Sequence, residues 1–244
     1  PVNRLSLLLP LAACLAAQTT PIPDKLVVLT FDDGVVSHAT HVAPLLKQYG
    51  FGATFFVCEF PPDFHDKSKY MTWEQMGQLS QMGFELASHT RSHTHLSRLS
   101  REQFIEELRY VEDKAASLGA PKIVSFAYPS YVTAPMAPGV LAGRGYRYAR
   151  IGGDKPYDPA RDNPYFIPSY TTLATNRDAI LNALRQARDG RVVVLTLHGV
   201  PDTAHPWVNT PPELFREYLN FLRDNHYTVI ALRDLDRYVK PAAR

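Results

Sequence analysis

The sequence predicts a single α/β domain, because short apolar runs alternate along its length with longer segments of helical period. Its 244 residues are 45% apolar, which suits one continuous core and leaves little room for two full domains. Acidic residues and histidines follow several of the apolar runs directly. Because the carboxyl ends of parallel strands share one face of such a fold, these side chains are expected to meet there.

The first 17 residues predict a secretory signal peptide, since Arg4 precedes a short apolar run and small residues. The sequence LAAC, which ends at Cys14, resembles a bacterial lipobox, while ordinary cleavage near Ala17 fits the same residues. We therefore expect an exported protein, periplasmic or extracellular, with a lipid anchor at Cys14 as the alternative to a free N-terminus. Either outcome leaves Cys58 without an intramolecular disulfide partner.

The charge pattern gives no reason to expect a nucleic-acid partner. The formal net charge is only +2, and lysine and arginine are scattered without a basic run or stripe. The chain after the signal is expected to form one domain, residues 25–239. No short-period repeat or low-complexity tract interrupts it.

Seven apolar runs have the length of strands. In chain order they are Leu26–Thr30, Ala53–Val57, Phe84–Ser88, Ile123–Ala127, Tyr146–Ile151, Arg191–Leu197 and Thr228–Ala231. Helices are expected at residues 73–82, 101–118, 177–188 and 212–225. Thr72 with Gln75 and Ser100 with Gln103 have the spacing of capping boxes, which supports the first two helix starts.

Asp32 and Asp33 follow the first strand directly, in the sequence LVVLTFDDG. An acid at this position can cap a helix, form a tight Asp-Gly turn, or ligate a metal beside a catalytic base. The sequence SHTRSHTHL adds His89 and His93, four residues apart, a spacing that places two imidazoles on one face of a helical turn. One carboxylate and two histidines supply three ligands and leave positions open for water and substrate.

His198 ends the strongest predicted core strand, RVVVLTLH. It either caps that strand by bonding to a neighbouring loop or, beside a metal site, serves as a general acid near neutral pH. His95 lies two residues beyond His93, and this offset is expected to point it away from the site.

These motifs resemble those of the polysaccharide deacetylases of the NodB homology class, carbohydrate esterase family 4. TFDDG stands here as Thr30–Gly34, and the family's His-Ser/Thr-x-x-His element stands as residues 89–93. The resemblance covers nearly all of residues 25–239 and implies a distorted (β/α) barrel. It also implies that Asp32 is the general base and His198 the general acid of a hydrolase that removes acetyl groups from a glycan.

The resemblance further makes Asp33, His89 and His93 the ligands of a divalent metal. Zinc is the default cation for this ligand set, although Co²⁺, Ni²⁺, Mn²⁺ or Fe²⁺ could occupy it. The implied substrate is an acetylated polysaccharide or oligosaccharide, and N-acetylglucosamine-type glycans are favoured over O-acetylated xylan.

The third family motif, usually Arg-x-Pro-Tyr-Gly, departs from the pattern. Here the sequence is Ala127-Tyr-Pro-Ser130-Tyr131, so alanine replaces the arginine that orients the base. The Ser130 N–H is expected to face the oxyanion, and Tyr131 replaces the usual glycine. The fourth motif, Asp-x-x-Asp-Trp, has no convincing copy. We therefore expect another group to tune Asp32, or catalysis to be weaker.

The long proline-rich loop after His198 contains Trp207, together with Asp202 and His205. It is expected either to form a sugar-stacking wall or to pack as an ordinary loop.

Two other functions stay open. A non-catalytic glycan-binding relative would explain the altered third motif, although it gives no reason to keep both the base and the acid. Iron-dependent oxygenases also use two histidines and one carboxylate. Their usual antiparallel barrel and His-x-Asp element do not match the order of motifs here.

Overall fold

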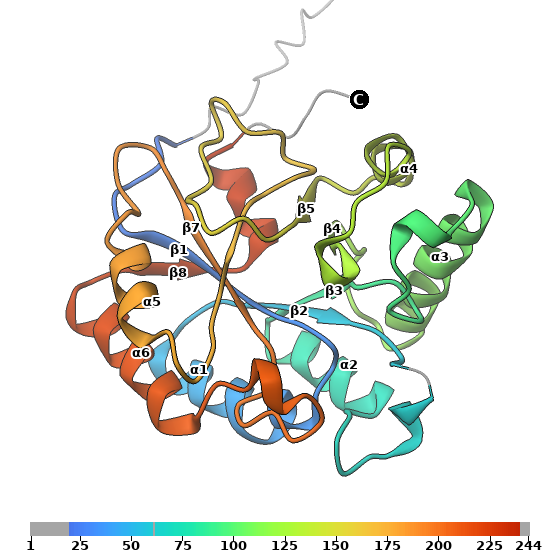
Figure 1. The fold of residues 1–244 in the computed structure, drawn as a ribbon, viewed down its shortest axis with the longest axis horizontal. Coiled ribbons are helices and arrows are strands. Elements are labelled where there is room, and N and C mark those ends of the chain that lie inside the picture. The colour runs from blue at the N-terminus through green and yellow to red at the C-terminus, as the bar shows by residue number, and fades with distance from the viewer. Residues whose placement is uncertain (1–19, 61, 240–244) are drawn as a thin grey trace, which may run out of the picture.

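The computed structural model describes residues 20–60 and 62–239. The predicted signal peptide, including Cys14, lies outside these residues. The described residues form one parallel sheet with helices around it (Figure 1). The strands are β1 Leu26–Phe31, β2 Thr54–Val57, β3 Glu85–Ser88, β4 Ser125–Ala127, β5 Tyr148–Arg150, β6 Tyr170–Thr171, β7 Val193–Leu197 and β8 Thr228–Ile230. The helices are α1 Ala43–Tyr49, α2 Trp73–Gln81, α3 Arg101–Ser117, α4 Ala137–Arg144, α5 Arg177–Leu184 and α6 Pro212–Asp224.

The sheet curls into the distorted (β/α) barrel that the sequence resemblance predicted. Its strand order is β5-β4-β3-β2-β1-β7-β6, and β8 pairs with the amino-terminal half of β1. The segment before β6 closes the gap between the two ends of this order. Ile167 exchanges main-chain hydrogen bonds with the β5 region, to Ala149 and from Ile151, each at 2.8 Å. A few residues later, β6 pairs with β7.

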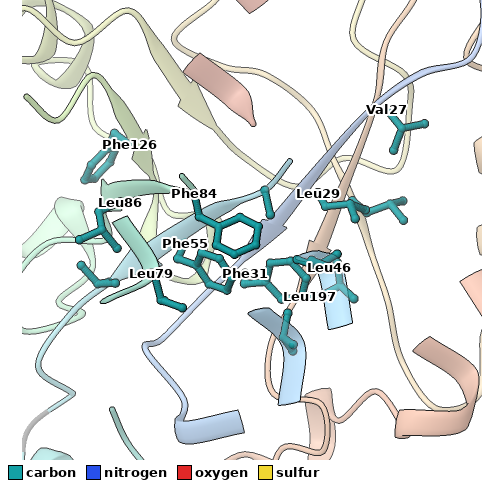
Figure 2. Close-up of a cluster of buried hydrophobic side chains, with 14 of the residues drawn as sticks. Val27, Leu29, Phe31, Leu46, Phe55, Leu79, Phe84, Leu86, Phe126 and Leu197 are labelled. Atoms are coloured by element: carbon teal, nitrogen blue, oxygen red, sulfur yellow. The ribbon is translucent and has the colours of Figure 1, made fainter. Parts of the chain in front are cut away.

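Alternation along the strands separates two cores. Val27, Leu29 and Phe31 of β1 belong to the larger core outside the barrel, shown in Figure 2, and Leu26 and Val28 to the smaller core inside it. Asp32 extends the β1 ladder by donating its main-chain N–H to the Leu197 carbonyl at 2.9 Å. The Asp32 side chain therefore points into the barrel, like those of Leu26 and Val28, and lies at the carboxyl end of the strands.

All seven predicted strands and all four predicted helices are present, and both capping boxes form. α5 ends at Leu184, earlier than predicted, and the chain then turns through left-handed Asp189 and Gly190 before β7. The sequence prediction missed the two-residue strand β6 and the helices α1 and α4. α4 contains one proline and two glycines, residues of low helix propensity, so its local sequence does not indicate a helix. None of the described helices combines the length and hydropathy needed to cross a bilayer.

Candidate active site

A cavity of about 370 Å³ opens at the carboxyl end of the barrel. Its lining brings together every site residue predicted from the sequence: Asp32, Asp33, His89, His93, Ser130, Tyr131, His198 and Trp207. A larger cleft of about 450 Å³ runs along α3 and contains none of these residues. His95 is not among the residues that line the cavity.

Asp32 is almost completely buried and has two differently placed carboxylate oxygens. Its Oδ2 accepts a hydrogen bond from the Arg150 guanidinium at 2.5 Å. Its Oδ1 has no hydrogen-bond partner among the described residues. One oxygen is therefore fixed by a cation, and the other is free to take a proton.

Sequence reasoning missed Arg150, the residue that binds Asp32. It is fully buried at the end of β5, donates a second hydrogen bond to Thr196 Oγ1 at 2.8 Å, and lies 5.3 Å from the ring centres of Phe56 and Tyr131. In the sheet it is the register partner of Ala127. The sequence analysis expected another group to replace the arginine missing at Ala127, and the structure places Arg150 of the adjacent strand beside Ala127 and against Asp32.

A signal for Arg150 was present in the sequence, because an arginine inside a predicted strand must pair with an acid if the strand is buried. That signal did not identify the partner. Asp32 lies 118 residues away along the chain.

Three potential metal ligands converge beside Asp32. Asp33 Oδ1 lies 3.4 Å from His89 Nε2 and 3.4 Å from His93 Nε2, and the three ligand atoms lie within 4.8 Å of one another. The expected helical turn between the histidines is wrong. Residues 89–93 form a loop in which Thr90 and His93 have positive φ angles of 61° and 53°, and this backbone turns both imidazoles toward Asp33.

The donor set fits a divalent cation. Asp33 Oδ1 is buried and has no hydrogen-bond partner among the described residues, as expected of an atom that awaits a ligand. His89 Nδ1 lies 2.8 Å from the Ala127 carbonyl. If Nδ1 carries the proton and donates it to that carbonyl, the Nε2 lone pair faces the site, an arrangement usual for a metal-ligating histidine.

Charges within the site set its protonation. Burial favours the neutral form of Asp33, but the adjacent His89 imidazole, together with the His198 and His93 imidazoles, outweighs this effect and holds its pKa well below the usual range. Burial, with His89 alongside, lowers the pKa of His93 to about 4, so this ligand is neutral at pH 7. Burial opposes protonation of His89, yet the Asp32 and Asp33 carboxylates raise its pKa. A cation bound at His89 Nε2 would compete with a proton for this nitrogen.

The second oxygen of Asp33 faces two other histidines. His198 Nε2 lies 3.9 Å and His205 Nδ1 3.6 Å from Asp33 Oδ2. His198 follows β7, and its carbonyl lies 2.9 Å from Nε2 of the buried His38, which fixes the backbone at this point. The sequence reasoning placed His198 at the pocket but did not foresee the support from His38.

His205 is the more firmly held of the two. It is buried, and its Nε2 lies 3.0 Å from the Tyr70 hydroxyl. Its main-chain N–H donates to Asp202 Oδ1 at 2.6 Å. The loop after β7 is therefore anchored into the pocket wall by a buried polar chain, whereas the sequence left its role open.

A family model described as polysaccharide deacetylase matches residues 19–148, more than half of the chain. The chain belongs to this family. A poly-beta-1,6-N-acetyl-D-glucosamine N-deacetylase of Escherichia coli is 34% identical over 83 residues, which cover 29% of this chain and 12% of that protein. The curated relatives are matched over only 12% to 47% of their own lengths.

Solved structures of carbohydrate esterase family 4 have the same fold. A family 4 acetyl xylan esterase from Clostridium thermocellum, in complex with a cobalt ion, superposes with a TM-score of 0.59 at 23% identity, covering 86% of this chain and 90% of that one. A family 4 pseudoenzyme from Bacillus anthracis superposes with a TM-score of 0.61 at 15% identity, covering 89% and 68%.

This member of the family departs from the usual pattern on one side of the pocket. Ser130 is exposed at the cavity with φ 50°, and Tyr131 follows with φ 61°. The Tyr131 hydroxyl lies 2.6 Å from Thr171 Oγ1, and its ring occupies space that a side chain at Gly152 would fill. Tyr131 is thus wedged over Arg150 where the family usually has glycine.

Trp207 lies at the rim of the cavity. Its side chain is 73% exposed, and its ring is 5.5 Å from that of His205 in an edge-on arrangement. A large aromatic side chain left in solvent beside a pocket presents an apolar surface to a ligand.

Proposed function

We propose that this protein hydrolyses acetyl groups from an acetylated glycan in a metal-dependent reaction. The observation that carries the proposal is that Asp32, bound through one oxygen by Arg150, stands beside a three-ligand group in the same pocket as His198. A metal site, an oriented carboxylate and a proton donor are the three groups that such a hydrolysis requires.

A divalent cation held by Asp33, His89 and His93 would polarise the acetyl carbonyl and make a water more acidic. Asp32 Oδ1 accepts a proton from the attacking water, because this oxygen is the one that Arg150 leaves unpaired. The water oxygen bonds to the acetyl carbon, and the carbonyl oxygen gains negative charge. The Ser130 N–H is the proposed donor to that oxygen.

His198 completes the reaction as general acid. When the bond between the acetyl carbon and the sugar nitrogen or oxygen breaks, His198 delivers a proton to the leaving atom. The products are acetate and a free sugar amine or hydroxyl. Zinc is our proposed metal, because one carboxylate and two imidazoles are ligands that it commonly takes.

We propose an N-acetylglucosamine-type glycan as substrate. The similarity to the E. coli N-deacetylase supports this choice, while the fold shared with the acetyl xylan esterase keeps O-acetyl xylan as the alternative. Trp207 is proposed to stack against a sugar ring, since its exposed ring stands at the pocket rim.

The test measures acetate release from N-acetylglucosamine oligomers and from acetylated xylan in parallel, after chelation and again after zinc is restored. We expect zinc-dependent release that the Asp32→Asn variant lacks, although this variant still binds zinc. The better substrate distinguishes amide from ester hydrolysis. No release from either substrate by zinc-loaded protein would contradict the proposal.

A non-catalytic glycan-binding protein is the second candidate, motivated by Ala127 and by the fold shared with a pseudoenzyme. The pairing of Arg150 with Asp32 weakens this candidate, because the missing arginine has been replaced in space. Tight binding of acetylated oligomers without turnover would support it.

We also propose that the protein is exported, with either a free N-terminus or a lipid on Cys14. The apolar run behind Arg4 and the LAAC sequence support this proposal. Mass spectrometry of the N-terminus of protein recovered from envelope and medium fractions tests it. An intact, unmodified N-terminal segment on cytosolic protein would contradict it.

A further inference from the structure

The loop that carries His89 and His93 has an unusual backbone. Thr90 is buried, β-branched and left-handed, with φ 61°, and His93 is also left-handed. Such residues persist only where their surroundings impose the conformation. The two imidazoles face Asp33 because of this backbone, so the groups that hold the loop also determine the ligand geometry.

One carboxylate outside the pocket holds the centre of this loop. Glu107 Oε2 accepts the main-chain N–H groups of Arg91 at 2.8 Å and Ser92 at 2.7 Å. Its Oε1 accepts the Ser92 hydroxyl at 2.9 Å. Three hydrogen bonds thus converge on a single side chain between the two predicted metal ligands. Among the described residues, no other side chain accepts a main-chain N–H of residues 89–93.

The helix that carries Glu107 is rigidly placed. α3 starts with a capping box at Ser100, and Phe104, Leu108 and Val111 bury one face of the helix in the outer core. Leu108, fully buried, directly follows Glu107. The packing of α3 on the larger core outside the barrel therefore positions the Glu107 carboxylate independently of the loop that it holds.

The opposite edge of the loop is held by the chain after β2. The Glu59 main-chain N–H donates to the Arg91 carbonyl at 2.7 Å. The Glu59 side chain accepts hydrogen bonds from Trp73 Nε1 at 2.8 Å and the Tyr110 hydroxyl at 2.6 Å. Its Oε2 also lies 3.5 Å from Arg91 Nε, but it accepts no main-chain N–H of the loop. Among the residues that the structure describes, Glu107 is therefore the side chain that binds the main-chain N–H groups of Arg91 and Ser92.

We propose that Glu107 is a positioning residue of the metal site, which holds the 89–93 loop in the left-handed conformation that aims both imidazoles at Asp33. The inference rests on the proposed metal-dependent function. A residue that determines metal affinity would then lie on α3, outside the two motifs that supply the ligands and outside the active-site cavity. Groups that orient metal ligands in this way commonly affect affinity by roughly 10–100-fold when they are removed.

The experiment measures zinc affinity of the full chain by competition with a chromophoric chelator, and the absorption spectrum of the Co²⁺-loaded protein. Glu107→Met removes all three hydrogen bonds at similar side-chain size. We expect roughly 10–100-fold weaker zinc binding and an altered Co²⁺ spectrum. Glu107→Gln should lower zinc affinity by about threefold or less, because its amide oxygen can accept both N–H groups and its amide nitrogen can donate to Ser92 Oγ.

Glu106→Gln is the matched control, since Glu106 is the exposed neighbour on the same helix, and its affinity should equal that of the wild type. Glu107→Asp shortens the side chain by one methylene, so its zinc affinity should lie between those of the Gln and Met variants. This variant tests the inference if Glu107→Met does not fold. Zinc affinity of Glu107→Met or Glu107→Asp equal to that of the wild type would overturn it. If the wild type bound no divalent metal, the proposed function would fall as well.

Discussion

The two sides of the active-site pocket are supported by opposite charges. On the metal-ligand side, the loop 89–93 is held from outside by the Glu107 carboxylate, which accepts main-chain N–H groups. On the base side, Asp32 is held by the buried cation Arg150. The first contact fixes a backbone, whereas the second compensates a buried charge.

This difference predicts a separation of effects. Changes on the metal-ligand side should alter metal affinity first. Changes around Asp32 and His198 should lower turnover while the metal remains bound. The following variants test this separation, in order of decreasing expected effect.

His198→Ala should have the largest effect. Loss of a general acid lowers turnover by about 10² to 10⁴-fold for an N-acetyl substrate, because the amine leaves poorly without a proton. An aryl acetate, whose leaving group needs no proton, should lose far less activity. Zinc affinity should stay near the wild-type value. Equal losses on both substrates would argue that His198 positions the site and does not donate the proton.

Arg150→Met should lower turnover by about 10²-fold, because Asp32 Oδ1 would no longer be aimed at the water. It should also lower the free energy of unfolding by about 3–5 kcal/mol, since Asp32 would remain buried without its cation. Zinc affinity and chemical denaturation are measured together with acetate release.

Two further variants sharpen the test of Arg150. Because Ala127 is its register partner, Ala127→Arg in an Arg150→Ala background should recover part of the turnover. Arg147→Met is the matched control on the flank of the same strand, where the side chain is partly exposed and pairs with Asp236. Full activity of Arg150→Met would contradict the role of Arg150.

His38 should make the stability depend on pH. Burial lowers its pKa to about 4, so the unfolded chain binds a proton between pH 6.5 and 4 that the folded protein does not. The stabilisation is complete above pH 6.5 and is lost as the pH falls toward 4. Between pH 7 and pH 5 this amounts to about 2 kcal/mol.

His38→Gln removes the titration and keeps an N–H donor that can reach the His198 carbonyl. Urea unfolding at pH 7 and pH 5 should therefore show a smaller pH dependence in this variant than in the wild type. An unchanged difference between the two pH values would show that His38 does not titrate as inferred.

Trp207→Ala should have the smallest effect. Loss of a stacking surface worth about 1 kcal/mol raises KM for a polymer several-fold, and a small acetyl ester should be unaffected. Trp207→Phe should keep most of the affinity for the polymer. A KM rise for both substrates would point to a role in shaping the pocket.

Much of the fold could be read from local sequence. Each predicted strand was an apolar run, and the boxes at Thr72 and Ser100 set the starts of two helices. β6 could not be predicted, because two residues have no detectable period and exist as a strand only through their pairing with β7. The spacing of His89 and His93 correctly predicted that the two imidazoles lie close together, but it assumed a helical turn. In the structure a loop brings them together.

The sequence by itself determined the residues whose chemistry depends on near neighbours: the adjacent acids Asp32 and Asp33 after a strand, the two histidines of one loop, and His198 at the end of β7. Their catalytic and ligand roles remain predictions that the geometry supports. Only the tertiary structure decided that Arg150 meets Asp32, that Glu107 holds the histidine loop and that His205 enters the pocket. Each of these contacts joins residues distant in the chain through sheet register or helix packing, and no local pattern records which distant side chains the closed barrel will bring together.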